Sequence, residues 1–292
     1  MNTNSPAGAW QRAFVLVTLA VLMLTVLDAS VKYLVRSYSL PMVSWARYFF
    51  HLATFGVWIL ATHRAVAVQT RRLPLQIVRG LLLVAVTFLF IAALGRLPLA
   101  DVTAINFLSP IVVTALSAIV LGEAVGWHRW LAVSVGFVGV LIIVRPGADV
   151  VNWGALLALG ATFFFALYQI ATRALAPTDP AVTTMFYTAL VGTAATSLIV
   201  PFFWATPTPA DFGLMFMAGV MGGGGHFLLI HAYRHAEASL VAPLFYVQIV
   251  FSAAFGFVVF DETPDVWTLA GAALIILGGL WIWSRERRES RP

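Results

Sequence analysis

Arg47 and His51 lie four residues apart in "WARYFFH", inside a stretch that is otherwise apolar. Arginine cannot lose its proton to escape the cost of burial, so a buried Arg47 must find an anion or a set of carbonyl groups. The anion could be Asp28, which lies in another apolar stretch, or a carboxylate or phosphate of a bound molecule. Arginine can hold such a group through two parallel hydrogen bonds. These residue types indicate anion binding at Arg47.

Asp28 and Lys32 lie four residues apart in "LTVLDASVKYLV". Aspartate before lysine at this spacing is the favourable order for an ion pair along a helix. One interpretation is that these two charges neutralise each other, or that Asp28 is permanently tied to Arg47. The other is that Asp28, Lys32 and Arg47 together leave one surplus positive charge. A substrate with a carboxylate or other anionic group would complete the site, and this is the hypothesis we favour.

His51 and His226 are the histidines predicted to lie well within apolar runs. An unperturbed histidine has a pKa of about 6.5, so either could exchange protons, and Asp28 is the carboxylate alternative. All three are predicted coupling residues, with hydrogen-bonded packing as the other interpretation of each histidine. The chain has no cysteine, and no H-E-x-x-H pattern lies inside a run, so we expect neither a metal nor another cofactor.

Uncharged polar and aromatic residues are expected to complete a binding cavity. The predicted substrate-binding residues are Arg47, Lys32, Tyr48, His51, Asn106, Tyr168, Gln169, Tyr187, His226 and Tyr246. One predicted helical face, with three- and four-residue spacing, consists of Ser44, Arg47, Tyr48, His51, Thr54 and Trp58. Tyr168 and Gln169 are adjacent and cannot both face inward, so some of these residues must be packing residues. The glycine run 222–225 predicts either close helix contact or a flexible break.

Membrane helices must position these residues. Hydrophobic residues make up 61% of the 292-residue chain and charged residues only 10%, which is outside the range of water-soluble proteins. A membrane helix needs about 20 apolar residues. We predict an all-α integral membrane protein with ten transmembrane helices. The predicted runs are 12–34, 41–62, 75–96, 98–121, 127–145, 153–175, 181–204, 212–234, 239–260 and 265–284.

The distribution of basic residues predicts the orientation in the membrane. Most arginines, including the group Arg64, Arg71, Arg72 and Arg79 and the basic tail 285–292, are predicted on one side. By the positive-inside rule that side is cytoplasmic, so both termini are expected in the cytoplasm. Because the basic residues are spread among loops and not gathered on one face, we expect no nucleic-acid partner.

The two halves of the chain resemble each other. A shift of 139 residues aligns Glu123 with Glu262 and Gly139 with Gly278 without a gap. In each half a span ends in an acid, a short turn follows, and a Gly-rich span begins. Five spans per half is an odd number, so the second copy must enter the membrane from the opposite side. Inverted repeats of this kind are typical of alternating-access transporters.

The block "LPLADVTAINFLSPIVVTALSAIVLGEAVGWHRWLAVSVGFVGVLIIVRPG", residues 97–147, resembles the EamA-type repeat of the drug/metabolite transporter superfamily. The second half resembles a weaker copy, with "FDE" where the first has "LGE". The resemblance implies two inverted five-helix repeats around a central cavity, with Glu123 in the signature. We expect the repeats at 1–147 and 148–284, followed by a cytoplasmic tail at 285–292. Superfamily members carry chemically diverse solutes, so the resemblance does not imply a substrate.

These patterns favour a secondary-active transporter that moves a small organic metabolite by alternating access in a bacterial inner membrane. We favour an anionic or zwitterionic solute such as an amino acid or carboxylate, with protons as the candidate coupling ion. The alternatives are an exporter of cationic or aromatic drug-like compounds, and an intramembrane enzyme with Asp28 and His51 as acid and base. No nucleophile motif accompanies that pair, so we do not expect an enzyme. The expected partners are the lipid bilayer and the substrate, and the chain would be a monomer or homodimer.

Overall fold

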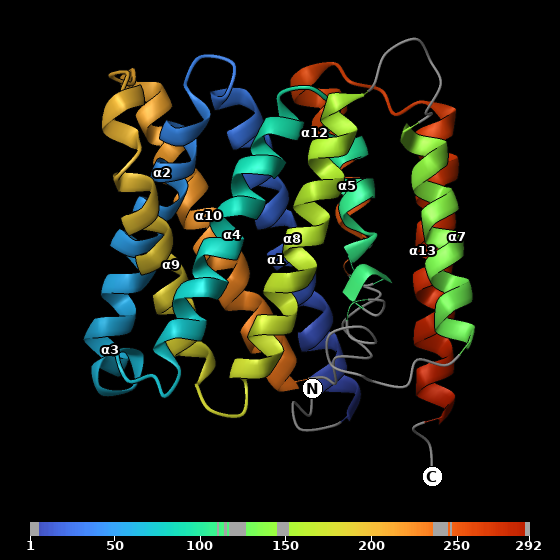
Figure 1. Cartoon of the computed structure of the whole chain (residues 1–292), viewed down its shortest axis with the longest axis horizontal. Helices are drawn as coiled ribbons and strands as arrows, with labels where there is room; N and C mark the ends of the chain where they lie inside the picture. The colour runs from blue at the N-terminus through green and yellow to red at the C-terminus, as the bar shows by residue number, and fades with distance from the viewer. Residues whose placement is uncertain are drawn as a thin grey trace. The chain divides into compact units, whose positions relative to one another are not determined.

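The computed structural model describes residues 6–109, 111–113, 116, 127–144, 152–235, 245 and 247–289, and most of this part of the chain is helical (Figure 1). In chain order the elements are α1 (Pro6–Leu34), α2 (Leu40–His51), the π-helix η1 (Leu52–Gly56), α3 (Val57–Ala67), α4 (Leu73–Leu94), α5 (Leu99–Asn106), α7 (Trp127–Val144), α8 (Trp153–Leu175), α9 (Ala181–Ser197), the 3-10 helix η2 (Val200–Phe203), α10 (Pro209–His235), α12 (Val247–Phe260) and α13 (Val266–Glu289). The prediction of an all-α fold is confirmed.

Several helices are suited to a bilayer. Within the described residues, four segments are long and apolar enough to cross a membrane, by length and composition: Phe14–Leu34, Leu73–Leu94, Trp153–Leu175 and Pro209–Leu229. Shorter apolar helices lie within other predicted spans, among them Val247–Phe260 and Val266–Gly278. Large apolar side chains remain strongly exposed, with Phe202 at 83% and Val258 at 78%. Such surfaces suit lipid, where a helix satisfies its own backbone groups.

Local sequence signals fix where the helices begin. Proline is the second residue of both α2 and α4, a position at which its missing N–H costs no helical hydrogen bond. Asn152 caps α8, and its Oδ1 accepts a hydrogen bond from the backbone N–H of Ala155 at 3.1 Å. Asp265 caps α13 in the same way, because its Oδ1 accepts from the N–H of Thr268 at 2.7 Å. These caps explain why the predicted run 153–175 coincides with α8.

The predicted second span is interrupted by the π-helix η1 (Leu52–Gly56). A π-turn inserts an extra residue and rotates the rest of the helix about its axis. The polar face expected to run from Ser44 to Trp58 therefore ends early. Ser44 and His51 are buried, but Trp58 is 41% exposed, so its predicted place on this face is wrong.

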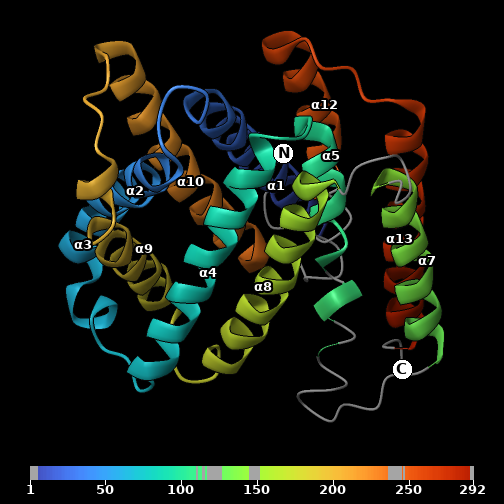
Figure 2. The same ribbon diagram turned by 45° about the horizontal axis from the view of Figure 1, so that its top comes forward.

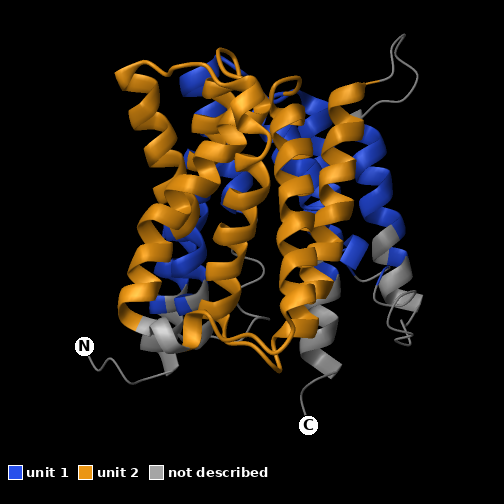
Figure 3. Cartoon of the chain, turned by 60° about the vertical axis from the view of Figure 1, so that its left-hand side comes forward, with its two compact units in different colours: residues 1–26, 98–151, 224–292 blue, residues 27–97, 152–223 orange. Residues whose placement is uncertain are grey.

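The chain forms two compact units, and helices of both sequence halves contribute to each (Figure 3). Unit 1 comprises residues 1–26, 98–151 and 224–292, and unit 2 comprises residues 27–97 and 152–223. The helices α1 and α10 each contribute one part to unit 1 and the other to unit 2.

In unit 2, α4 packs along α8 and α9, and α9 also contacts α2 and α3. The pairing of α4 with α8 is visible in two views (Figures 1 and 2). Side-chain hydrogen bonds join the connections at the ends of these helices. Near the start of α10, the Tyr38 hydroxyl donates to Asp211 at 2.7 Å and accepts from the N–H of Thr208 at 3.1 Å.

In unit 1, α7 packs along α13 and α5 packs against α12. Gly139 and Gly271 permit the first contact, because a Cβ at either position would meet the backbone carbonyl oxygen of the other. The Thr103 hydroxyl bonds to that of Ser252 at 2.9 Å between α5 and α12. Glu262 accepts a hydrogen bond from the N–H of Leu99 at 3.0 Å, which satisfies a donor at the start of α5. Its predicted counterpart Glu123 lies outside the described residues.

The glycine run 222–225 forms an unbroken part of α10. In unit 2, a Cβ at Gly223 would collide with Phe55 and approach the His51 ring to 2.9 Å. A Cβ at Gly219, one turn earlier, would lie 2.9 Å from the backbone nitrogen of His51. Of the two interpretations of the run, close helix contact is therefore confirmed.

Candidate functional site

Arg47, Tyr48 and Thr87 form a hydrogen-bonded group between α2 and α4 in unit 2. The Tyr48 hydroxyl lies 2.7 Å from the Thr87 hydroxyl and 3.0 Å from the carbonyl oxygen of Leu83. One guanidinium nitrogen of half-buried Arg47 lies 3.5 Å from Thr87 Oγ1, at the outer limit of a hydrogen bond. The same guanidinium lies 5.8 Å from the centre of the Tyr48 ring. These two neutral side chains therefore contact the guanidinium of Arg47.

Asp28 is an acidic group that interacts electrostatically with Arg47. It lies on α1 and is 9% exposed, and the positive charge of Arg47 reaches its carboxyl electrostatically. Lys32, one turn further along α1, is 5% exposed and donates a hydrogen bond to the carbonyl oxygen of Leu97 at 2.6 Å. That contact ties α1 to the connection after α4. A role for Lys32 in substrate binding stays a prediction.

A second cation, Arg79, lies in the same unit, two turns before Thr87 on α4. Its guanidinium donates to the hydroxyls of Thr172 at 2.6 Å, Thr188 at 2.6 Å and Tyr168 at 2.5 Å, and to the carbonyl oxygen of Thr184 at 3.3 Å. It also lies 4.3 Å from the centre of the Tyr168 ring. Only 4% of Arg79 is exposed. The predicted run 75–96 includes this arginine, but its grouping with Arg64, Arg71 and Arg72 indicated only the orientation in the membrane and not a site.

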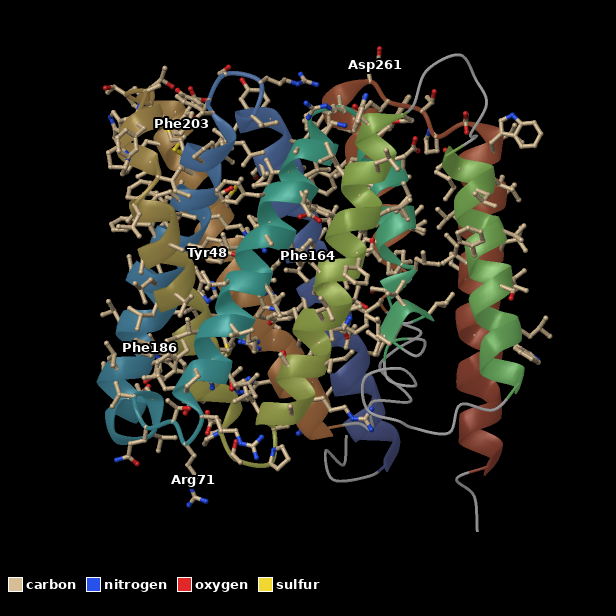
Figure 4. The ribbon with its side chains drawn as sticks, viewed as in Figure 1. Tyr48, Arg71, Phe164, Phe186, Phe203 and Asp261 are labelled. Carbon is tan, nitrogen blue, oxygen red and sulfur yellow. The ribbon has the colours of Figure 1, made fainter. Side chains whose placement is uncertain are left out.

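Aromatic side chains surround this polar group. Tyr48 forms a buried cluster with Leu83 and Val86, against which Phe164, Phe165 and Tyr168 of α8 pack. In Figure 4 Tyr48 and Phe164 lie near the middle of the helices, whereas Arg71 and Phe203 lie at opposite ends. A mainly apolar lining with a few converging polar groups is typical of small-molecule sites.

The remaining predicted residues are spread over both units. His51 is 7% exposed, one turn after Arg47 on α2, and its ring contacts that of Phe55 edge-on at 6.0 Å. Gln169 is half-buried on α8. Tyr187 donates to the carbonyl oxygen of Val68 at 3.0 Å, so it contacts the connection after α3, and its role in substrate binding stays a prediction.

Three predicted residues lie elsewhere. His226 and Asn106 are half-buried in unit 1. Tyr246 lies outside the described residues. The predicted residues in unit 2 are Asp28, Lys32, Arg47, Tyr48, His51, Tyr168, Gln169 and Tyr187. Contacts within that unit join Arg47 to Tyr48 and Thr87, and join Tyr168 to Arg79, which also binds the threonines of α8 and α9.

Asp179 marks the end of the same unit, in the connection between α8 and α9. It accepts hydrogen bonds from the Thr70 hydroxyl, from Gln76 at 2.8 Å and from the N–H of Arg71 at 3.2 Å. Burial by itself would raise the pKa of Asp179, but these hydrogen bonds, with one from Thr178, hold that pKa below its usual value. The ionised carboxylate therefore ties the connection before α4 to the connection before α9.

Comparison with known proteins identifies the family. The sequence matches the EamA-like transporter family twice, over residues 11–145 and 152–284. The chain belongs to the EamA-like transporter family. It thereby belongs to the drug/metabolite transporter superfamily, and the two matches agree with the two-repeat fold expected from the sequence.

Curated relatives from bacteria carry different small molecules. The S-adenosylmethionine uptake transporter of Rickettsia bellii is 32% identical over 220 residues, covering 75% of this chain and 76% of that protein. The pseudopaline exporter CntI of Pseudomonas aeruginosa is 29% identical over 267 residues, covering 90% and 92%. The riboflavin transporter of Vibrio cholerae is 31% identical over 227 residues, covering 77% and 76%. This EamA-family member is therefore a multi-pass membrane protein of a family that transports small metabolites.

A solved crystal structure has the same fold. It superposes with a TM-score of 0.66 at 18% identity, covering 98% of this chain and 100% of the other. At this identity the likeness supports the fold alone.

Proposed function

We propose that this protein is a secondary-active transporter that moves a small organic solute with a carboxylate or other anionic group by alternating access. The observation that carries the proposal is the setting of Arg47. Its guanidinium lies beside neutral Thr87 and Tyr48, with Asp28 as an acidic group that acts on it. A permanently charged arginine in a membrane helix is costly unless an anion accompanies it. A substrate carboxylate would supply a second anion when the site is filled.

The aromatic lining favours a solute that also has a planar or apolar part. Tyr48, Phe164, Phe165 and Tyr168 offer ring faces and edges close to the two arginines. S-adenosylmethionine, named for one relative, joins an amino-acid carboxylate to a purine ring, and riboflavin, named for another, has a flavin ring. The same lining keeps an exporter of aromatic compounds as the second candidate, in which the rings and not Arg47 would select the substrate.

Asp28 is the proposed coupling residue. Its carboxyl is buried in α1 and subject to the charge of Arg47, so protonation of Asp28 would change the charge balance of the site. His51, one turn after Arg47, and His226 in unit 1 are the alternative proton carriers. We place the protein in a bacterial inner membrane with both termini in the cytoplasm, because exposed arginines such as Arg71 and Arg72 gather at the end where α4 begins.

Counterflow in proteoliposomes tests this function. Vesicles containing the purified protein are loaded with one unlabelled solute and placed in the same labelled solute, starting with S-adenosylmethionine, glutamate and riboflavin. Transient accumulation of label identifies a carrier and excludes a channel. The Arg47→Gln variant should lose accumulation of carboxylate solutes. The control is Arg96→Gln, which changes an exposed arginine that follows α4 and donates to the carbonyl oxygen of Ala92, and this variant should retain accumulation. Equal accumulation by wild type and Arg47→Gln would reject Arg47 as the anion-binding group.

A further inference from the structure

Arg79 is a buried cation, and its hydrogen-bond acceptors among the described residues are all neutral. Among the described residues, its hydrogen bonds go to three hydroxyls and one backbone carbonyl. These oxygens orient the guanidinium, but they do not cancel its charge. A buried charge without a counter-ion is expensive, and an arginine cannot relieve that cost by losing its proton.

Asp179, a carboxylate that contacts the first turns of α4, is already engaged. Gln76, one turn before Arg79 on α4, donates to Asp179 at 2.8 Å. Asp179 also accepts from Thr70 and from the backbone N–H of Arg71. The carboxylate of Asp179 therefore holds together the connection before α4 and the connection before α9.

The position of Arg79 on α4 relates it to Arg47. Residues 79, 83 and 87 follow one another at four-residue spacing, so they lie along one side of the helix. Thr87 contacts Arg47, the carbonyl of Leu83 accepts from Tyr48, and Arg79 binds Tyr168. At 1.5 Å per residue, Arg79 and Thr87 are about 12 Å apart along α4. Arg79 is also about 9 Å from the first residue of α4.

We propose that Arg79 is a second anion-binding station, which takes the carboxylate of the transported solute after it leaves Arg47. This proposal rests on the proposed function and extends it. It adds a binding site in the half of the transport path that lies toward the start of α4. When no solute is bound at this station, the hydroxyls of Tyr168, Thr172 and Thr188 accept hydrogen bonds from the guanidinium and fix its orientation. When a carboxylate arrives, it replaces some of these hydroxyls as acceptor, so Arg79 exchanges neutral partners for an ionic one.

A cysteine reporter tests the station directly, because the native chain contains no cysteine and gives no background reaction. Thr172→Cys places a thiol beside Arg79, at a half-buried position. In membrane vesicles, its labelling is timed with an anionic sulfonatoethyl and a cationic trimethylammonium-ethyl methanethiosulfonate of similar size. A positive site that accepts anions should favour the anionic reagent at least tenfold. Adding Arg79→Gln should bring the ratio of the two rates close to one.

Two results would overturn the proposal. One is equal labelling by both reagents with Arg79 present, and the other is no labelling from either side of the membrane under any gradient. If Arg79 were only a structural tie, Arg79→Lys and Arg79→Gln would lower the melting temperature, and counterflow per folded molecule would not change. With a working station, Arg79→Gln slows carboxylate counterflow at least tenfold and Arg79→Lys restores part of it. Loss of the proposed function has a different signature, because the wild type would then show no carboxylate counterflow while the labelling ratio is still measurable.

Discussion

The hydroxyls of Tyr48 and Thr87 lie 2.7 Å apart and join α2 to α4 at the level of Arg47. Both groups also bond to the carbonyl oxygen of Leu83, at 3.0 and 2.9 Å. The pair fixes the neutral surface on which the guanidinium of Arg47 lies. Its geometry therefore decides how the arginine is presented to a solute.

Tyr48→Phe removes one partner from this pair while keeping the ring in place. We expect a loss of about 0.5–1.5 kcal/mol in stability, as is usual for one buried hydrogen bond, because Thr87 can still donate to Leu83. Affinity for a carboxylate solute should fall severalfold, since Arg47 is then less well positioned. Melting temperature and ligand titration measure the two effects. The matched control is Tyr187→Phe, whose exposed bond to Val68 lies at the end of α3, and it should leave affinity unchanged.

Asp179→Asn should destabilise unit 2 in a pH-dependent way. Because hydrogen bonds lower the pKa of Asp179 in the folded protein, the ionised carboxylate contributes stability above the unfolded-state value of about 3.9. That contribution disappears as the pH falls through the lower folded-state pKa. The variant should therefore melt below wild type at pH 7, and the two melting temperatures should converge once the pH has fallen below the folded-state pKa of Asp179. A difference that persists unchanged in acid would mean that the charge of Asp179 is not what stabilises the connections.

Gly219→Ala should separate α10 from α2. The new Cβ would lie 2.9 Å from backbone atoms of both Phe50 and His51, which cannot move aside as a flexible side chain would. We expect destabilisation of about 1–3 kcal/mol. Gly213→Ala is the matched control on the same helix, because nothing lies within 4 Å of its Cβ. That variant should be neutral or stabilising, by up to about 1 kcal/mol. Equal melting temperatures for the two variants would show that the helices do not need the close contact.

Asp28→Asn tests the proposed coupling. The substitution keeps the shape of the side chain but removes the proton-binding group and the charge that acts on Arg47. We expect uptake driven by a pH gradient to disappear, whereas exchange of solute across the membrane continues. Measuring both in the same proteoliposomes separates coupling from binding. Wild-type dependence on the pH gradient in this variant would transfer the coupling role to His51 or His226.

Hydropathy predicted most of the fold, because a helix in lipid must be a long apolar run. The run 153–175 coincides with α8, and Arg47, Tyr48 and His51 were found because charged and polar groups are conspicuous in such runs. Arg79 lies within the predicted run 75–96, but Arg71 and Arg72 precede it closely, so the three indicate a cytoplasmic boundary of the membrane and not a site. Its burial depends on Thr172, Thr184 and Thr188, which are 93 to 109 residues away in sequence. The π-helix that turns Trp58 outward left no pattern in the sequence that would have shown it.

The central claim is that Arg47 binds an anionic group of the solute. The most direct measurement is the thermal shift of wild type and Arg47→Gln with matched pairs of an amino acid and its uncharged-carboxyl amide, together with S-adenosylmethionine and its decarboxylated form. Ligand binding raises the melting temperature by mass action. We predict that the acid of at least one pair stabilises the wild type, that its partner without the carboxylate does not, and that neither stabilises Arg47→Gln. Equal stabilisation by both members of every active pair, in both proteins, would contradict the claim and leave the aromatic lining as the selective element.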